Sequence, residues 1–186
     1  MIGLQGLTSR EIAVSAGLGL GAAAAGLASL PPLTALAGGC LAFSMVLIML
    51  ADYRHFIIPD ILSLPAIPLG IAEIAVRDID LVGDRLLAAG LGGGSLFLLR
   101  LAYRRLRGIE GLGLGDVKLA MAAGAWTGVT GLPWVLLIAC AAALTAVLVQ
   151  RWRSPAGSLT LQSALPFGAF LAPAILAVWV GQVWPA

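Results

Sequence analysis

Long apolar runs fill most of the chain, and short stretches with charged residues, proline or glycine separate them. The runs are rich in Leu, Ala and Gly and lack the polar alternation of strands in a lipid-facing barrel. As α-helices, runs of about 15 to 20 residues are long enough to cross a hydrocarbon layer of ~30 Å. The pattern therefore predicts an all-α, polytopic transmembrane helix bundle. We expect about seven spans, over residues 11–29, 34–51, 60–76, 84–102, 116–130, 133–150 and 164–184.

Composition supports a membrane protein rather than a soluble one. Hydrophobic residues make up 60% of the 186 positions and charged residues only 11%, too few to cover a soluble particle. Most of the surface is therefore expected to face a lipid bilayer. The connectors are too short for a separate soluble domain, so residues 1–186 are interpreted as a single transmembrane domain. The first apolar run lacks the pattern of a cleaved signal peptide and is interpreted as a retained helix.

Lysine and arginine gather in every second connector, which indicates an orientation in the membrane. The larger set comprises Arg10, Arg54, the arginines of residues 100–107, Lys118, Arg151 and Arg153. By the positive-inside rule this set is cytoplasmic, with the N-terminus inside and the C-terminus outside. A six-span alternative omits the short, glycine-rich fifth run and places the C-terminus inside. Three acidic residues of the opposite side are interpreted as solvated loop charges: Asp78, Asp80 and Asp84.

Other features argue against several kinds of site. The net charge of +2 and the lack of a long basic run other than residues 103–107 argue against a nucleic-acid partner. Cys40 and Cys140 lie in apolar runs without a Cys or His neighbour at metal-ligand spacing, and His55 is the single histidine. We expect no metal, no disulfide and no histidine-based triad. The sequence gives no indication of the oligomeric state. The tryptophans lie mostly near the ends of spans, typical of an aromatic belt: Trp126, Trp134, Trp152, Trp179 and Trp184.

Two aspartates at the ends of apolar runs require an explanation, because an ionisable residue near membrane depth is costly. Asp52 ends the second run and Asp116 opens the fifth, and the charge pattern places both on the same side of the membrane. A structural role is open for each. Asp116 is a candidate helix N-cap, as is Asp60 after Pro59, whereas a carboxylate at the end of a helix, as at Asp52, opposes the helix dipole. Asp52 is instead a candidate ion-pair partner of Arg54.

The functional interpretation of these two residues is a catalytic dyad. Two carboxylates at close range share one proton, because both cannot easily carry a negative charge. One aspartate then activates water as a general base, while the protonated one donates to the carbonyl oxygen of the bond that is cleaved. Such a pair titrates as a unit, so neither role is assigned to one residue.

Three stretches of the sequence, in a fixed order, carry the most distinctive motifs of the chain. The first is Asp52 followed by Ile-Pro-Asp at residues 58–60. The second is Gly-Leu-Gly-Leu-Gly-Asp-Val-Lys-Leu at residues 111–119, which continues as Ala-Met-Ala-Ala-Gly-Ala-Trp-Thr-Gly. The third is Leu-Pro-Phe-Gly-Ala-Phe at residues 165–170, at the start of the last span. Together these motifs resemble those of the type IV prepilin peptidases, a family of GxGD-type aspartyl peptidases. The resemblance covers nearly the whole chain, and the three motifs together are far more specific than any one of them.

The resemblance implies roles for matching residues. Asp52 and Asp116 are the expected catalytic aspartates, and Gly113 and Gly115 are the glycines of the GxGD motif. Four further positions match the family pattern and are expected to shape the site or bind substrate: Asp60, Lys118, Pro166 and Gly168. Glu110, beside the motif, is interpreted as a solvated loop charge, with contact to a basic leader peptide as the alternative.

The resemblance also implies a substrate, a location and a departure from the family pattern. The expected substrate is a pilin-like precursor with a short basic leader and a hydrophobic helix, cleaved at the cytoplasmic face of a bacterial inner membrane. Many bacterial members carry an insertion with paired CxxC motifs that is associated with methylation of the new N-terminus. No CxxC motif occurs here, so we expect cleavage without methylation and without zinc, S-adenosylmethionine or another cofactor.

Two other functions use the same residues differently. In a small transporter or channel, Asp52 and Asp116 would relay protons or bind a cation, with flux but no proteolysis. In a noncatalytic membrane scaffold, both aspartates could be replaced with function intact. A third alternative, close to the first hypothesis, is an intramembrane GxGD protease of the presenilin or signal-peptide-peptidase kind. The loop-like Ala-Asp-Tyr-Arg-His context of Asp52 and the Leu-Pro-Phe-Gly stretch in place of a Pro-Ala-Leu motif argue against it.

Overall fold

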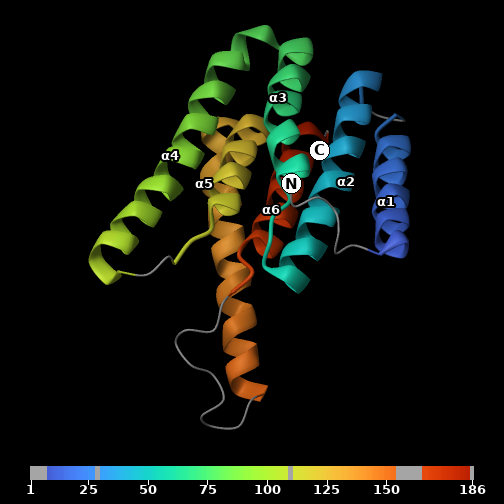
Figure 1. Cartoon of the computed structure of the whole chain (residues 1–186). Coiled ribbons are helices and arrows are strands. Elements are labelled where there is room, and N and C mark those ends of the chain that lie inside the picture. Colours follow the sequence, from blue (N-terminus) through green and yellow to red (C-terminus); the bar gives the residue numbers. More distant parts are fainter. Residues whose placement is uncertain (1–7, 28–29, 109–110, 154–164, 185–186) are drawn as a thin grey trace.

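The computed structural model describes residues 8–27, 30–108, 111–153 and 165–184, which form an α-helical bundle (Figure 1). The α-helices are α1 (Ser9–Leu27), α2 (Pro32–His55), α3 (Asp60–Arg77), α4 (Val82–Arg107), α5 (Leu114–Arg153) and α6 (Gly168–Val183). A short 3-10 helix, η1 (Ile79–Leu81), joins α3 to α4. The described residues contain no β-strand. The all-α prediction is confirmed.

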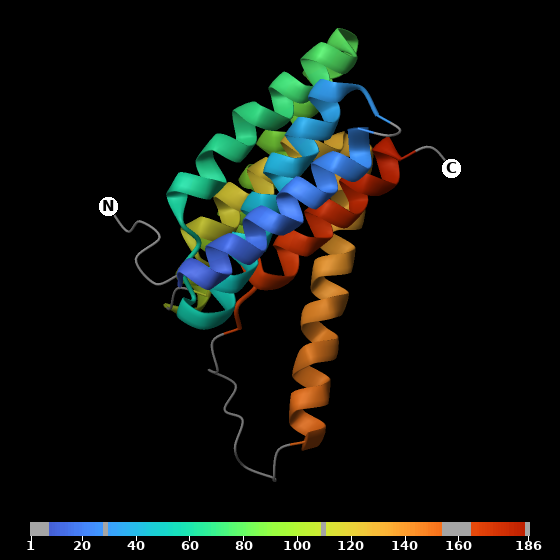
Figure 2. The ribbon, with the colours of Figure 1, turned by 90° about the vertical axis from the view of Figure 1, so that its right-hand side faces the viewer.

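Helix α5 is interrupted at Gly128, where the backbone has φ 70° and ψ −177°. This conformation is readily accessible only to glycine, which lacks a Cβ. Figures 1 and 2 show that the chain reverses its direction here, so residues 114–127 and 129–153 run opposite ways. The sequence predicted this boundary near Pro133. Pro133 instead lies in the helical segment after the break, near its start, where a proline is tolerated.

The reversal brings together helix ends that are far apart in the sequence. Figure 1 shows that α2 and α4 end, and α3, α5 and α6 begin, at the same end of the bundle, which we call the site end. The opposite end, with the start of α4 and the break in α5, is called the far end. Arg54 and Arg107, at the ends of α2 and α4, both belong to the site end, as the alternating charge pattern predicts.

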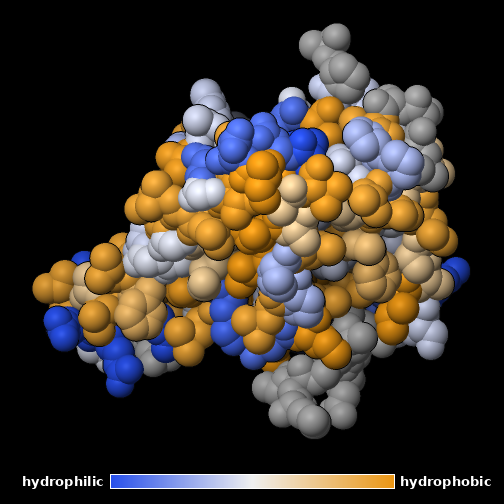
Figure 3. Space-filling view, turned by 90° about the horizontal axis from the view of Figure 1, so that it is seen from above, coloured by the Kyte–Doolittle hydropathy of each residue, from blue (hydrophilic) through white to orange (hydrophobic). Residues whose placement is uncertain are grey.

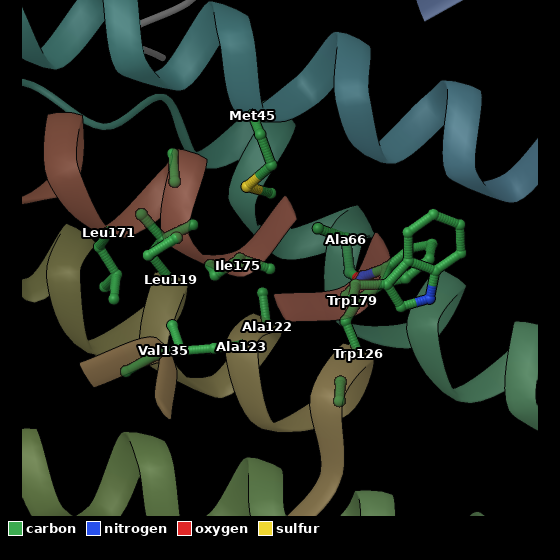
Figure 4. Close-up of a cluster of buried hydrophobic side chains, with 14 of the residues drawn as sticks. Met45, Ala66, Leu119, Ala122, Ala123, Trp126, Val135, Leu171, Ile175 and Trp179 are labelled. Carbon is green, nitrogen blue, oxygen red and sulfur yellow. The ribbon is translucent and has the colours of Figure 1, made fainter. Parts of the chain in front are cut away.

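A core of small and aliphatic side chains holds the helices together. Figure 4 shows Met45 of α2, Val135 of α5 and Ile175 of α6 converging in this core, and all three are buried. Trp126 and Trp179 also lie there and pack edge to face, with ring centroids 5.5 Å apart. The prediction that these two belong to an aromatic belt was wrong. The Trp126 indole donates to the carbonyl oxygen of Ala66 at 2.7 Å, which satisfies its buried N–H group.

The surface agrees with a membrane environment. By length and apolar composition, three described helical stretches can cross a bilayer: Pro32–His55, Ile79–Arg107 and Leu114–Arg153. Figure 3 views the molecule from the far end, where hydrophobic side chains cover most of the visible surface and hydrophilic ones form separate patches. The chain is therefore a polytopic helical membrane protein.

Charged and polar side chains also bind the backbone at the far end. Arg85 of α4 is only 5% exposed and donates to the carbonyl oxygen of Trp126. Asp84 accepts a hydrogen bond from the backbone N–H of Val129 at 3.1 Å, and Gln182 of α6 donates to the carbonyl oxygen of Thr127 at 2.9 Å. These bonds satisfy backbone groups beside the break in α5, which apolar surroundings would otherwise leave unpaired. The interpretation of Asp84 as a solvated loop charge was wrong, because it has this structural partner.

Candidate active site

Asp52 lies one turn before the end of α2, and its carboxylate reaches the beginning of α6. The residue is 5% exposed, and its Oδ2 accepts a hydrogen bond from the backbone N–H of Ala169 at 2.8 Å. The backbone N–H of Gly168 also interacts with this carboxylate. A helix N-terminus carries unpaired N–H groups and a partial positive charge, so it stabilises an anion. Asp52 thus opposes the dipole of its own helix but complements that of α6.

Asp116 lies in the first turn of α5 and is partly buried. Its Oδ2 accepts a hydrogen bond from the backbone N–H of Gly113 at 3.2 Å. The side chain therefore reaches back to the residue before the helix, as the acidic residue of a capping box does. Asp116 is therefore not the N-cap that was predicted, because α5 begins at Leu114, but its carboxylate binds a backbone N–H at the helix start from within the first turn.

The two carboxylates come from different helices and meet at the site end. The Asp52 carboxylate is close enough to Asp116 for the two groups to interact electrostatically. Each is held through its Oδ2 atom by a backbone N–H at the start of a helix. The predicted pairing of Asp52 with Arg54 is wrong, because Arg54 forms its ion pair with Glu11 of α1. Arg54 is therefore not the group that holds the Asp52 carboxylate, which is bound by the N–H of Ala169.

Asp60 and Lys118 form an ion pair between α3 and α5 beside the site. Lys118 Nζ lies 2.6 Å from Asp60 Oδ1, which connects the first turn of α3 to the first turns of α5. The N-cap residue of α3 is Pro59 and Asp60 is the first residue inside the helix, so the prediction of Asp60 as the N-cap was wrong. Both side chains are partly exposed. This ion pair holds the start of α3, which follows the connector after Asp52, next to the start of α5, which carries Asp116.

The two glycines beside the aspartates allow close packing. A Cβ atom at Gly115 would lie 2.8 Å from the Cβ of Ile58, and one at Gly168 would lie 2.6 Å from its Cδ1. Gly113 supplies the N–H that binds Asp116. Pro166 precedes α6, and its carbonyl oxygen accepts from the N–H of Ala169 at 3.2 Å. The structure therefore brings Gly113, Gly115, Pro166 and Gly168 close to the two carboxylates.

Helix α4 supports the connector before Asp116, a role that sequence reasoning missed. Arg100 Nη1 donates to the carbonyl oxygen of Leu112 at 2.6 Å. A Cβ at Gly111 would lie 2.5 Å from the ring of Tyr103, so the ring packs directly against this glycine. In the sequence these residues appeared only as part of a basic connector. Glu110, a predicted loop charge, lies outside the described residues.

The chemistry available at this site is that of two carboxylates. In the described part of the chain, no three or more His, Cys, Asp or Glu side chains form a metal-binding group. Two carboxylates that interact can exchange one proton between them and with a bound water molecule. The arrangement is therefore suited to general acid–base chemistry on a substrate that reaches the site end.

Comparison with known proteins agrees with the motifs. Residues 39–148 match the type IV leader peptidase family. This range includes Asp52, Asp60, Asp116 and Lys118 and ends before α6. No solved structure matches the chain significantly.

Three relatives illustrate the extent of the similarity. The prepilin leader peptidase/N-methyltransferase of Burkholderia pseudomallei (strain K96243) is 39% identical over 163 residues, which cover 83% of this chain and 50% of the relative. Leader peptidase HopD of Escherichia coli is 39% identical over 129 residues, which cover 69% of this chain and 82% of the relative. The prepilin leader peptidase/N-methyltransferase of Pseudomonas aeruginosa is 31% identical over 145 residues, which cover 77% of this chain and 48% of the relative. The chain thus spans about half the length of several curated relatives that it matches.

Proposed function

The chain belongs to the type IV leader peptidase family, and from this we propose that it is a membrane-embedded aspartyl endopeptidase. Its substrates are prepilin-like precursors, from which it removes the basic leader peptide. The proposed catalytic residues are Asp52 and Asp116. The observation that carries the proposal is the meeting of these two carboxylates, from α2 and α5, at the site end of an apolar bundle.

The proposed mechanism uses the dyad as both acid and base. The ionised aspartate removes a proton from a water molecule as the water oxygen attacks the carbonyl carbon of the scissile bond. The protonated aspartate donates its proton to the carbonyl oxygen, which gives a neutral tetrahedral intermediate. When the C–N bond breaks, the aspartate that took the proton from water donates it to the leaving nitrogen, and a hydroxyl group of the intermediate returns a proton to the other aspartate as the new carboxyl group forms. The pair then again holds one proton.

The hydrogen bonds of the site support this division of work. The N–H groups of Gly113 and Ala169 hold one oxygen of each carboxylate, which fixes the direction in which the other oxygen points. Such fixed geometry lowers the entropic cost of aligning water and the scissile bond. Asp60, Lys118, Pro166 and Gly168 position helix starts around the dyad and are proposed to act through that geometry.

The location of the reaction follows from the charge pattern. The site end carries Arg54 and the arginines at the end of α4, so we assign it to the cytoplasmic face of a bacterial inner membrane. A precursor whose hydrophobic helix lies in the bilayer would present its leader junction at that face. The proposal covers peptide-bond cleavage. The methyltransferase activity in the names of longer relatives belongs to those proteins.

The test is cleavage of candidate pilin-like precursors by the purified protein in lipid vesicles, with mass determination of the new N-terminus. Asp52→Asn and Asp116→Asn should each reduce the cleavage rate by at least ~10²–10⁴-fold, the range of general acid–base catalysis. Asp80→Asn is the matched control, because Asp80 is exposed in η1 beyond the far end. Full activity in either Asn variant, or aspartate-dependent ion flux without cleavage, would contradict the proposal.

A further inference from the structure

Ile58 occupies the short connector between α2 and α3. Helix α2 ends where Phe56 adopts a left-handed conformation with φ 54°, and the chain then turns toward Pro59. Ile58 is partly buried and packs against the hydrophobic core, whereas its neighbour Ile57 is 41% exposed. The turn at Phe56 thus directs one of the two isoleucines inward, at the level of the aspartates.

The side chain of Ile58 lies between the beginnings of α5 and α6. Its Cβ faces Gly115, where an added Cβ would lie only 2.8 Å away. Its Cδ1 faces Gly168, where the corresponding distance is 2.6 Å. The inner end of the side chain therefore contacts α5 and its tip contacts α6, and neither glycine leaves room for a larger residue.

Each of these two contacts is next to one aspartate. Gly115 immediately precedes Asp116, and Gly168 precedes Ala169, whose N–H binds Asp52. An added Cβ at Gly168 would also lie 3.0 Å from Asp52 Oδ2, so this glycine borders the carboxylate itself. Ile58 therefore lies between the segment that carries Asp116 and the helix start that binds the Asp52 carboxylate.

We propose that Ile58 is a positioning residue, a spacer that sets the separation between the Asp52 and Asp116 carboxylates. Isoleucine is suited to this task, because its β-branch restricts rotation about χ1 and makes the side chain stiff. The same spacer explains why Gly115 and Gly168 are both glycine, since each must lack a Cβ to pack against Ile58. It rests on the proposed function where it describes catalysis, and on geometry alone where it describes the separation.

The first test reads catalysis. Shortening the spacer moves the two carboxylates relative to each other, and a displacement of about 1 Å can reduce a rate ~10²-fold. Ile58→Ala should therefore lower kcat by roughly 10- to 100-fold with little change in KM, and Ile58→Val, which lacks only the Cδ1 atom, should have a smaller effect in the same direction. Ile57→Ala is the matched control. An unchanged kcat in both Ile58 variants would overturn the proposal.

A double-variant comparison uses the asymmetry of the two contacts. Ala at position 58 lacks the Cδ1 that collides with a Cβ at position 168, but it keeps the Cβ that collides with one at position 115. Gly168→Ala should therefore cost less kcat and less thermal stability when combined with Ile58→Ala than alone. For Gly115→Ala the closest contact, with the Cβ at position 58, remains, and only the longer contacts with Cδ1 and Cγ1, at 3.2 and 3.3 Å, are lost, so its cost should be relieved much less. Equal behaviour of the two glycine variants would contradict the assigned contacts.

A third test measures the separation without proteolysis. In a variant with Cys40 and Cys140 changed to Ala, Asp52→Cys and Asp116→Cys introduce a thiol at each end of the gap. Cross-linking with bifunctional thiol reagents of increasing span should give one narrow optimum when Ile58 is present. Ile58→Ala should shift this optimum to a shorter span or broaden it, and Ile57→Ala should not.

The outcomes separate the two proposals. An unchanged cross-linking profile in Ile58→Ala and Ile58→Val would refute the spacer even if the protein cleaves precursors. A shifted profile in a protein that cleaves none of the precursors would support the spacer and refute the proposed function.

Discussion

The two ends of the bundle both contain charged groups removed from water, but they use them in opposite ways. At the far end, Arg85 and Asp84 bond to backbone groups of opposite polarity beside the break in α5. At the site end, Asp52 and Asp116 have the same charge and interact with each other. A buried charge is tolerated when it is paired, whereas two like charges destabilise each other. The charged groups of the far end are therefore explained by their contribution to stability, whereas the pair of acidic groups at the site end requires a functional explanation.

The hydrogen bonds of the two ends support this distinction. The far-end side chains satisfy the carbonyl of Trp126 and the N–H of Val129, which the break in α5 would leave unpaired. The site-end carboxylates accept from Gly113 and Ala169 at helix starts, and the N–H of Ala169 has a second acceptor in the carbonyl oxygen of Pro166. Loss of a side chain should therefore unfold the protein at the far end and inactivate it at the site end.

The largest effect on stability is expected at Arg85. Arg85→Met removes a buried positive charge and leaves the Trp126 carbonyl without this donor. Breaking a buried ion-pair or hydrogen-bond network typically costs about 3–5 kcal/mol in the free energy of unfolding. Denaturant unfolding of the detergent-solubilised protein measures this change, with the exposed Arg107→Met as control. A loss no greater than that of the control would remove the contrast between the two ends.

A smaller loss is expected at the break itself. Gly128→Ala forces a Cβ into a left-handed conformation and against the Asp84 carboxylate, which should cost about 1–3 kcal/mol. Gly90→Ala is the matched control, because Gly90 lies within α4 with no atom within 4 Å of an added Cβ. That control should be neutral or stabilising, since alanine favours helix over glycine. If both variants have the same melting temperature, the break does not depend on glycine.

The smallest effect is expected at the Asp60–Lys118 ion pair. Both side chains are partly exposed, at 58% and 30%, so water screens their attraction. Exposed pairs contribute about 0–1 kcal/mol, and Asp60→Asn and Lys118→Gln should each change stability by no more than this. Their cleavage rates should fall far less than those of the dyad variants. Complete loss of cleavage in Lys118→Gln would place this lysine in the chemistry.

The sequence predicted the elements of the site but not all of their contacts. Lipid-crossing runs and alternating basic connectors were enough to place Asp52 and Asp116 at one end. The partner of Asp52 is Ala169, 117 residues away, and no local pattern marks such a contact. For the same reason Arg54 was paired with its neighbour Asp52, although it reaches Glu11 on another helix.

The break in α5 lies at Gly128, a few residues before the boundary predicted near Pro133. Pro133 gave the stronger sequence indication of a helix boundary, but proline is also tolerated in the first turn of a helix. Gly128 resembled the many other small residues of the bundle, and only its φ of 70° reveals its role. Asp84 was read as a solvated loop charge because its partner, the N–H of Val129, exists only once the chain reverses there.

The most direct test compares activity and stability in the same two variants. For Asp52→Asn and Asp116→Asn, cleavage of a pilin-like precursor and thermal unfolding should be measured on one preparation of each protein. Cleavage should be lost in both variants while the melting temperature stays the same or rises, because the substitution removes one of two acidic groups that disfavour each other's ionisation. Unfolding of both variants at markedly lower temperature, with residual cleavage in proportion to the folded fraction, would show that the aspartates serve the fold and would contradict the dyad.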